Sequence, residues 1–472
     1  MKNLLYSTLA LALGSGCVSP QAKEESTPNV IIIFTDDQGY QDLGCYGSEK
    51  IKTPNIDKLA NNGIRFTDFY VSNSVCSPSR ASLLTGRFPA RHGVGGALFP
   101  GESGLAPKNI ILSEILKKEG YHTACYGKWH LGDVAEQMPL NQGFDEYFGI
   151  PYSNDMYIGV NQQFADNVKF RDGFDLSKAK ADQDTVAHTK KFKDFIDKGL
   201  SGRCPLFEGN KIVEYPCDQA TLTNRYFNRA IDFIDQSKGE PFFVYITPAM
   251  PHVPLHASAS FKGKSEGGAY GDAVEEIDWN VGMLINNLKE KGILDNTIII
   301  FASDNGPWLK MGDQAGSAAP LRDGKGSIFE GGIRIPCIMS WPHRWEKGKV
   351  SHNMVSTYDL VPTIAAYAHA DVSNLKLDGN NQSKHLEDIT QKVGNDTFAI
   401  FRRDELSGIR VGDWKYLRFG GDYHKWNKEG VAHKPLLFNL KEDLAESVNR
   451  IEDEPEVVEM MKKRIEELEA SF

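Results

Sequence analysis

A cysteine is followed four residues later by an arginine in the segment CSPSRASLLTGR, residues 76–87. Ser77 and Pro78 are typical of a helix N-cap and a first helical residue, and Gly86 is typical of a helix end. We therefore expect Cys76 to lie just before a helix N-terminus, where free N–H groups favour anions and lower the pKa of a thiol. On this segment alone, a reactive cysteine and a buried structural cysteine are equally good interpretations.

Two apolar runs end in the same kind of polar side chain. One ends in Asp36 and Asp37, and the other ends in Asp304 and Asn305. Either pair alone is explained as a turn that closes a strand. Three carboxylates in one place would repel each other without a cation, and their hard oxygen ligands select Ca²⁺ or Mg²⁺ over zinc. Two matching pairs on matching strands therefore favour a metal site.

Four basic side chains stand in short polar segments. Lys128 and His130 alternate in GKWHLG, so an extended chain would turn both toward one side. His252 stands in the proline-rich PAMPHVPLH and Lys325 in the glycine-rich LRDGKGSIFEGG. Each alone is more often an ordinary surface or hydrogen-bonded residue. Beside a metal and a nucleophile, they suit an anionic tetrahedral group whose charge is stabilised while an oxygen leaves.

The elements that position these residues follow one repeated pattern of helix, apolar strand and polar loop. Helical patterns that precede such strands lie at 109–120, 223–239 and 273–292. Continuous apolar strands between amphipathic helices predict an α/β fold with a large, mostly parallel sheet covered by helices on both faces. Because ligands bind beyond the carboxyl ends of such strands, one pocket could collect all the polar clusters.

The pattern changes in two places. Residues 151–216 are polar and weakly periodic, which is typical of an insertion that is functional or mobile. After residue 390, short strand patterns and a final amphipathic helix predict a small C-terminal α+β subdomain with an antiparallel sheet. The predicted division of the chain is a signal peptide at 1–17, a tether at 18–27, a large α/β domain at 28–390 and the subdomain at 391–472.

The net charge limits the partners that the protein can have, and the N-terminal sequence indicates its cellular location. The 472 residues carry a formal net charge of −10 without a long basic run, which argues against nucleic acid as a partner. The start MKNLLYSTLALALGSGC reads as a signal peptide that is too short to span a membrane. Cys17 is either the lipidated first residue of a bacterial lipoprotein, with Gly14 where a lipobox holds leucine, or close to a simple cleavage site. We expect an exported protein, periplasmic or lipid-anchored to the outer membrane, that meets the membrane only through such a lipid.

The remaining cysteines suggest one disulfide. Cys204 and Cys217 flank a short loop, and export permits a bond between them, which is a hypothesis that peptide mapping without reductant would test. The chain holds no CxxC pair, which argues against a zinc–thiolate site.

The stretch Cys76-Ser77-Pro78-Ser79-Arg80 resembles the C-x-P-x-R signature of type I sulfatases, a family of the alkaline phosphatase superfamily. Further segments are similar to family segments in family order: IIFTDDQGY, GKWHLG, FASDNGP, GKGSIFEGGIRIP and LFNLKEDLAESVN. The segment QGFDEYFGIPYSND is similar to the arylsulfatase A and N-acetylgalactosamine-6-sulfatase branch. The resemblance runs from about residue 28 to the C-terminal helix.

This resemblance implies a modified nucleophile and a calcium ion. A formylglycine-generating or anaerobic sulfatase-maturating enzyme would oxidise Cys76 to formylglycine, whose hydrated aldehyde attacks sulfur. One Ca²⁺ per chain would be held by Asp36, Asp37, Asp304, Asn305 and the modified Cys76.

The resemblance also implies a role for each basic residue. Arg80 and Lys128 would orient the diol and neutralise its charge. His252 and Lys325 would bind the sulfate, and His252 would protonate the leaving alcohol. His130 would take a proton from the remaining hydroxyl, which expels sulfate and regenerates the aldehyde.

For the substrate, export and the branch resemblance favour a sulfated polysaccharide or oligosaccharide. Candidates are a galactan such as carrageenan and a galactosamine-containing glycosaminoglycan. Residues that could contact the sugar, although each is more simply explained as an ordinary loop residue, are Arg91, His92, Asn154, Asp155, Arg402 and Arg403.

Two other functions compete with this one. The first is a phosphatase or phosphonate monoester hydrolase of the same superfamily, and the cysteine signature without a second metal cluster argues against it. The second is a catalytically inactive protein that binds sulfated glycans, and the complete catalytic set argues against it.

Overall fold

The structure is a computed structural model that describes residues 27–189, 191–394, 396–419 and 434–472. The predicted signal peptide, Cys17 and all but the last residue of the predicted tether lie outside the described residues. Within those ranges, none of the helices combines the length and the apolar character needed to cross a membrane.

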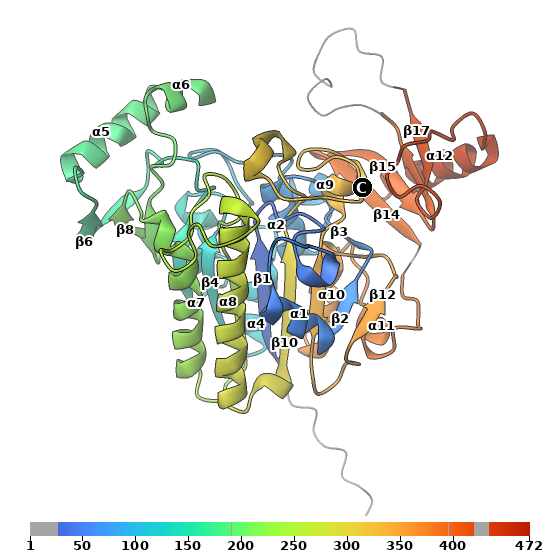
Figure 1. Ribbon diagram of the computed structural model, residues 1–472, viewed down its shortest axis with the longest axis horizontal. Coiled ribbons are helices and arrows are strands. Elements are labelled where there is room, and N and C mark those ends of the chain that lie inside the picture. Colours follow the sequence, from blue (N-terminus) through green and yellow to red (C-terminus); the bar gives the residue numbers. More distant parts are fainter. Residues whose placement is uncertain (1–26, 190, 395, 420–433) are drawn as a thin grey trace, which may run out of the picture.

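An 11-stranded mixed sheet forms the centre of the molecule (Figure 1). Across the sheet the strands are β12 (Lys349–Ser351), β2 (Ile64–Phe66), β11 (Cys337–Ser340), β10 (Thr297–Ser303), β1 (Asn29–Thr35), β9 (Phe242–Thr247), β4 (His122–Lys128), β5 (Glu146–Ile150), β7 (Leu206–Glu208), β8 (Lys211–Tyr215) and β6 (Gln163–Phe170). The central run from β10 to β5 is parallel throughout. The predicted α/β architecture is therefore confirmed.

The central strand β1 explains how the sheet is buried. Its sequence NVIIIFT is buried at every position, and successive side chains point to opposite faces. Ile31 and Ile33 enter one apolar core, whereas Ile32 and Phe34 enter the other. A strand that is buried on both faces needs the continuous apolar run that the sequence shows.

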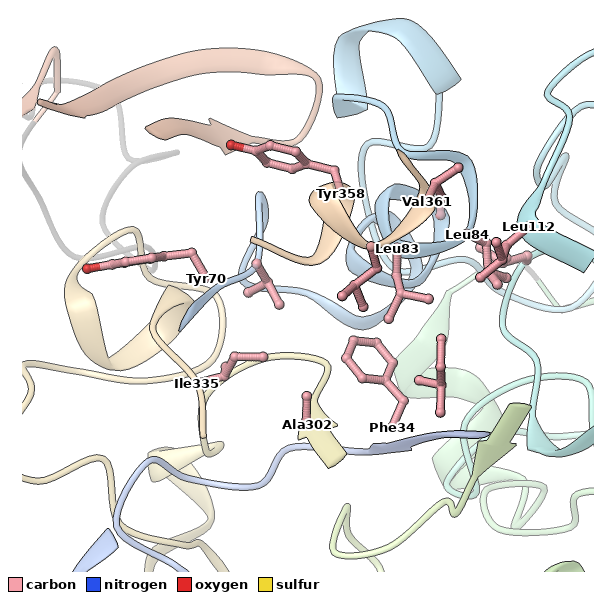
Figure 2. Close-up of a cluster of buried hydrophobic side chains, with 14 of the residues drawn as sticks. Phe34, Tyr70, Leu83, Leu84, Leu112, Ala302, Ile335, Tyr358 and Val361 are labelled. Carbon is pink, nitrogen blue, oxygen red and sulfur yellow. The ribbon is translucent and has the colours of Figure 1, made fainter. Parts of the chain in front are cut away.

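Helices cover both faces of the sheet. The helices on one face are α1 (Pro54–Asn61), α7 (Gln219–Gln236) and α8 (Gly268–Glu290), and those on the other are α2 (Cys76–Thr85), α4 (Leu112–Lys118) and α10 (Leu360–Tyr367). Figure 1 shows α7 and α8 side by side along the sheet. In Figure 2, Leu83 of α2 lies between Phe34 of β1 and Val361 of α10, and Leu84 lies beside Leu112 of α4. Apolar packing on both sides thus holds α2 over the end of β1.

Residues 151–216 belong partly to the main sheet, which corrects the expectation of an insertion unlike the rest. They add β7, β8 and β6 as the outermost strands on one side, together with α5 (Leu176–Ala187) and α6 (Phe192–Asp197). Strand β6 is exposed or half-exposed along its whole length. An edge strand of this kind needs no apolar run, so its sequence lacks the signal of the central strands.

The C-terminal part forms the predicted antiparallel sheet and final helix. Its strands are β14 (Thr397–Arg402), β15 (Glu405–Val411), β16 (Trp414–Leu417) and β17 (Leu436–Asn439), followed by α12 (Pro455–Glu469). Phe398, Ile409 and Met461 belong to the same apolar core as α2. Smaller elements complete the fold: β3 (Phe69–Tyr70) paired with β13 (Val355–Ser356), and the short helices α3 (Pro89–His92), α9 (Glu330–Ile333) and α11 (Ser383–Glu387).

Candidate active site

The helix that carries the cysteine begins earlier than the sequence predicts. Helix α2 starts at Cys76 itself, with Val75 as the N-cap residue, so Pro78 is its third residue. Proline is tolerated there because N–H groups of the first turn have no partner within the helix. The Ser77 hydroxyl accepts a hydrogen bond from the Leu98 N–H at 3.1 Å instead of capping α2. The predicted end at Gly86 is confirmed, with a left-handed φ of 66°.

Burial governs the Cys76 thiol. The residue is 2% exposed, and its Sγ lies 3.5 Å from Asp36 Oδ1. Burial raises the pKa of the thiol to about 12, although Lys128 and Lys325 act to lower it. The expectation of a lowered thiol pKa is therefore wrong, because the cost of burying a thiolate exceeds the attraction of the helix N-terminus and of these cations. Unmodified Cys76 is accordingly a poor nucleophile in this site.

The five predicted metal ligands converge on one place at the carboxyl ends of β1 and β10. One ligand atom from each of Asp36, Asp37, Cys76 and Asp304 lies within 4.8 Å of the others, and all four residues are buried. The Asn305 amide donates to Asp37 Oδ1 at 2.7 Å, and its own Oδ1 is buried without a hydrogen-bond partner among the described residues. Asp37 adopts a left-handed φ of 61°, a strained conformation that is typical of functional sites.

Three cations pair with the three carboxylates. Arg80 donates to Asp304 Oδ2 from Nε at 2.9 Å and from Nη2 at 2.7 Å. Lys128 Nζ lies 2.5 Å from Asp36 Oδ2, and Lys325 Nζ lies 2.8 Å from Asp37 Oδ2. All of these side chains are buried except that of Lys325, which is half-buried where it lines the cavity described below. The pairs therefore cancel each other's charge and leave no net attraction for an anion.

The pKa values of the carboxyl groups reflect this crowding. Burial acts to raise the pKa of Asp36, but the Lys128 ammonium and further cations outweigh it and hold the pKa far below its usual range. Burial and the neighbouring Asp36 raise the pKa of Asp304 to about 6.

These residues fit a hard divalent cation such as Ca²⁺. The donor set consists of carboxylates and an amide, which are the oxygen ligands that this ion takes. The unpartnered Asn305 Oδ1 is a buried acceptor that a cation would satisfy. When bound, the ion would add positive charge beside position 76. The three ion pairs supply no excess positive charge at that place.

His252 is held in one orientation by its neighbours. Its Nδ1 lies 3.1 Å from Asn154 Oδ1 and 2.5 Å from the Val253 carbonyl oxygen. Because the Asn154 amide donates from Nδ2 to the Pro254 carbonyl at 2.9 Å, its Oδ1 is the atom that faces His252. Two acceptors at Nδ1 place the ring proton there and leave Nε2 directed at the site, 3.6 Å from Asp37 Oδ2.

His130 reaches the site by a route that the sequence does not predict. Strand β4 ends at Lys128, and His130 has a left-handed φ of 61°, so strand alternation does not place the two side chains together. Its Nε2 donates to the Leu98 carbonyl at 2.9 Å, and its buried Nδ1 has no hydrogen-bond partner in the part of the chain that the structure describes. Burial, together with Lys128, holds the pKa of His130 well below its usual range. The neutral ring therefore presents a vacant proton-accepting nitrogen.

A cavity of about 220 Å³ opens beside these groups. Its lining comprises Val75, Cys76, Ala97, Phe99, His130, Ser153, Asp155, Met156, His252, Trp308, Lys325 and Gly326. Sequence reasoning missed Ser153, whose Oγ lies 3.3 Å from Lys128 Nζ, and Trp308, whose ring centre lies 4.8 Å from Lys325 Nζ. The signal for Ser153 is its place just after β5, another carboxyl end of the parallel sheet.

Of the predicted sugar contacts, Asp155 lines the cavity and two others are elsewhere in the fold. Arg91 Nε forms an ion pair with Asp378 at 2.7 Å, and Arg91 Nη2 donates to the Ser471 carbonyl at 2.8 Å. His92 is 3% exposed, and both of its ring nitrogens are bonded within the protein. Both side chains stabilise the fold around α2 and neither lines the cavity, so a sugar contact at Arg91 and His92 stays an untested prediction.

The other predicted sugar contacts also lie outside the cavity lining. Asn154 is fully buried and contacts His252 instead. Arg402 and Arg403 lie at the turn between β14 and β15, where the Arg403 carbonyl accepts a hydrogen bond from the Asn73 amide at 2.9 Å. This turn therefore supports the segment that leads to Cys76.

Cys204 and Cys217 lie together but are not bonded. Their sulfur atoms are 3.2 Å apart, and both thiols are buried and free. The Cys217 N–H donates to the Cys204 carbonyl at 2.9 Å, which holds the two backbones side by side. The disulfide stays a prediction.

Comparisons with known proteins agree with this geometry. The family model described as Sulfatase matches residues 28–370. Bovine arylsulfatase A is 36% identical over 99% of this chain and 91% of its own, and human N-acetylgalactosamine-6-sulfatase is 33% identical over 89% and 80%. The crystal structure of Ps i-CgsB in complex with k-i-k-neocarrahexaose superposes with a TM-score of 0.74, at 31% identity over 94% of this chain and 93% of the other.

Proposed function

The chain belongs to the sulfatase family and is a sulfuric ester hydrolase, and from this premise we propose that it cleaves sulfate esters of a sulfated polysaccharide or oligosaccharide. The proposed substrates are a galactan such as carrageenan or a galactosamine-containing glycosaminoglycan. The proposed nucleophile is a formylglycine made from Cys76, and the proposed cofactor is one Ca²⁺ held by Asp36, Asp37, Asp304 and Asn305.

One observation carries the proposal: Cys76, Lys325, His252 and His130 line the same cavity beside a buried carboxylate cluster. The unmodified thiol, with its raised pKa, would be largely protonated and inert at neutral pH. A hydrated aldehyde at this position offers two hydroxyls, one to attack sulfur and one to expel the sulfate afterwards. The buried setting thus favours a modified residue over the thiol as the nucleophile.

The surrounding side chains suit the steps of this reaction. Lys325 and Ser153 offer hydrogen-bond donors to the sulfate oxygens. His252, with its Nδ1 proton held by Asn154, would protonate the leaving alcohol from Nε2 as an imidazolium, with a second proton on Nε2. His130 would accept a proton at its vacant Nδ1 when the second hydroxyl expels sulfate.

Two comparisons support a carbohydrate as the substrate. The neighbouring structure Ps i-CgsB contains a bound k-i-k-neocarrahexaose, and the human relative bears the name N-acetylgalactosamine-6-sulfatase. Both names point to galactose-type sugars. Conversion of Cys76 by a maturation enzyme, export to the periplasm and a lipid on Cys17 complete the proposal and rest on the sequence alone.

The test measures sulfate release from carrageenan, chondroitin, dermatan, heparin and ulvan fragments by protein made together with a maturation enzyme. Mass spectrometry of the tryptic peptide 66–80 first establishes whether the sulfur of Cys76 has been lost. The Cys76→Ala variant is the control, and a calcium chelator followed by added Ca²⁺ tests the cofactor.

We expect sulfate release from one sugar class, loss of release in Cys76→Ala, and loss and recovery with chelator and Ca²⁺. Full activity with an intact thiol would refute the formylglycine. No release from any saccharide by converted protein would refute the carbohydrate substrate, and binding without release would favour a glycan-binding protein.

A further inference from the structure

Asp155 presents an unpaired carboxylate to the cavity. It is a lining residue, and its Oδ1 is buried without a hydrogen bond to any described residue. Within the described part of the chain, no lysine or arginine forms an ion pair with Asp155. The carboxylates of Asp36, Asp37 and Asp304, in contrast, each have such a partner. A buried acceptor without a partner costs free energy, which a bound donor would recover.

The backbone holds this carboxylate in place. The Asp155 carbonyl accepts hydrogen bonds from the Gly202 N–H at 2.9 Å and from the Ser201 hydroxyl at 2.8 Å. Ser153 and Asp155 both line the cavity, whereas Asn154 between them contacts His252 from behind. Asp155 therefore faces the same space as the sulfate-binding groups and is fixed to the segment that follows α6.

The rest of the outer wall is apolar. Ala97, Phe99, Met156 and Trp308 line the cavity together with Asp155. The Trp308 ring centre lies 5.6 Å from that of His252, so this wall begins directly beside the proposed leaving-group acid. An apolar wall with one fixed polar group is the usual form of a site that orients a small ligand. The C–H face of a pyranose ring suits such a wall, and its hydroxyls suit a single acceptor.

We propose that Asp155 selects the sugar: the substrate ring is a neutral galactose-type sugar or N-acetyl sugar whose only anionic group in the cavity is the sulfate that is cleaved. A ring hydroxyl next to the ester donates a hydrogen bond to Asp155 Oδ1. A ring that carries a second sulfate or a carboxylate at that place meets a like charge in a largely desolvated site, which is strongly disfavoured. This inference rests on the proposed function, because it assumes that the cavity receives a sulfated sugar.

The test compares Asp155→Asn with the wild-type protein on matched sugars. The probes are galactose and N-acetylgalactosamine that carry sulfate at O4, at O6 or at both positions. The readout is the ratio of kcat/KM for the monosulfated sugar to kcat/KM for the disulfated sugar. Because sulfate release is compared at the same ring position in both sugars, an effect of Asp155 on proton transfer from His252 enters both values of kcat/KM and cancels in their ratio. Asp166→Asn, an exposed carboxylate on β6, is the matched control.

We expect the wild-type protein and Asp166→Asn to prefer the monosulfated sugar by the same ratio. Asp155→Asn should lose about 10- to 100-fold in kcat/KM on that sugar, the range for a hydrogen bond to a charged group. Asp155→Asn should lose nothing, or gain, in kcat/KM on the disulfated sugar, so the ratio falls by at least tenfold. Asp155→Glu, which keeps the charge, should retain the wild-type direction of preference.

Two results would overturn different statements. Release from mono- and disulfated sugars with a ratio that Asp155→Asn does not change would overturn the role of Asp155 and leave the sulfatase on a carbohydrate intact. Release from no sugar by fully converted wild-type protein would overturn the proposed substrate class, and the selection by Asp155 with it.

Discussion

Acid should destabilise the protein through one buried histidine, His92, at the end of α3. Its Nδ1 accepts the Val94 N–H at 3.1 Å, so that nitrogen carries no proton, and its Nε2 donates to the Ser82 hydroxyl at 3.0 Å. The residue is 3% exposed. Burial, with a smaller contribution from Arg87, lowers the pKa of His92 to about 3, against about 6.5 in the unfolded chain.

The sign of the effect follows from which state binds the proton. Between pH 6.5 and pH 3 the unfolded chain binds a proton at His92 and the folded chain does not, so stability falls as the pH falls. The contribution is complete above pH 6.5, and each pH unit below it costs about 1.4 kcal/mol. A change from pH 7.5 to pH 4.5 therefore costs about 2.7 kcal/mol. For a chain of this length, the entropy of unfolding is about 1 kcal/mol per degree. The loss of about 2.7 kcal/mol in the free energy of unfolding therefore lowers Tm by about 3 °C.

The assay measures Tm at pH 7.5 and pH 4.5 for wild type, for His92→Asn and for His343→Asn. Asparagine at position 92 keeps an acceptor for the Val94 N–H but does not titrate. We expect His92→Asn to lose about 3 °C less than wild type between the two pH values, whatever its stability at pH 7.5. His343 is exposed, so His343→Asn should follow wild type. Equal acid sensitivity of His92→Asn and wild type would refute the assignment of a buried neutral His92.

Two further substitutions test buried contacts. Asn154→Ala removes the amide that holds the Nδ1 proton of His252. Because the leaving group of 4-nitrophenyl sulfate needs no proton, we expect kcat/KM to fall about tenfold more on a sulfated saccharide than on that substrate. An equal loss on both substrates would indicate a merely structural role for Asn154. Lys415→Met removes the cation that lies 2.9 Å from Glu330 and 2.8 Å from Glu446, so Glu446 loses its ion-pair partner among the described residues while Glu330 keeps Arg334 at 3.3 Å. We expect it to lower the free energy of unfolding by about 3–5 kcal/mol in urea, against little change in the exposed control Lys462→Met; similar stability of the two variants would contradict that.

The buried carboxylate cluster could be predicted because its signal is local. Asp36 and Asp304 each follow a strand whose apolar run is unbroken, and such runs occur where a parallel strand is buried on both faces. β1 and β10 pair in register from Asn29 with Thr297 to Thr35 with Ser303. Because these two parallel strands end opposite each other, the residues that follow them lie at the same edge of the sheet. The strand pattern alone therefore brings the carboxylates together.

Features that depend on burial or on non-repetitive backbone could not be predicted in this way. The helix start at Cys76 indicates a lowered thiol pKa, but burial by distant segments reverses the sign. His130 reaches the cavity through a left-handed φ that no strand or helix period contains. Strand β6 carries no apolar run because the edge of the sheet does not require one.

The different positions of the Asn154 and Asp155 side chains could not be predicted from the sequence. Both are short polar residues just after β5, and in the sequence either one suits a sugar contact. The chain turns Ser153 and Asp155 toward the cavity and Asn154 toward His252, a choice set by hydrogen bonds to Pro254 and Gly202 far along the chain. In the reaction that we propose, these adjacent positions therefore have different roles: Asn154 would act on the proton that the leaving alcohol receives, and Asp155 on which sugar enters.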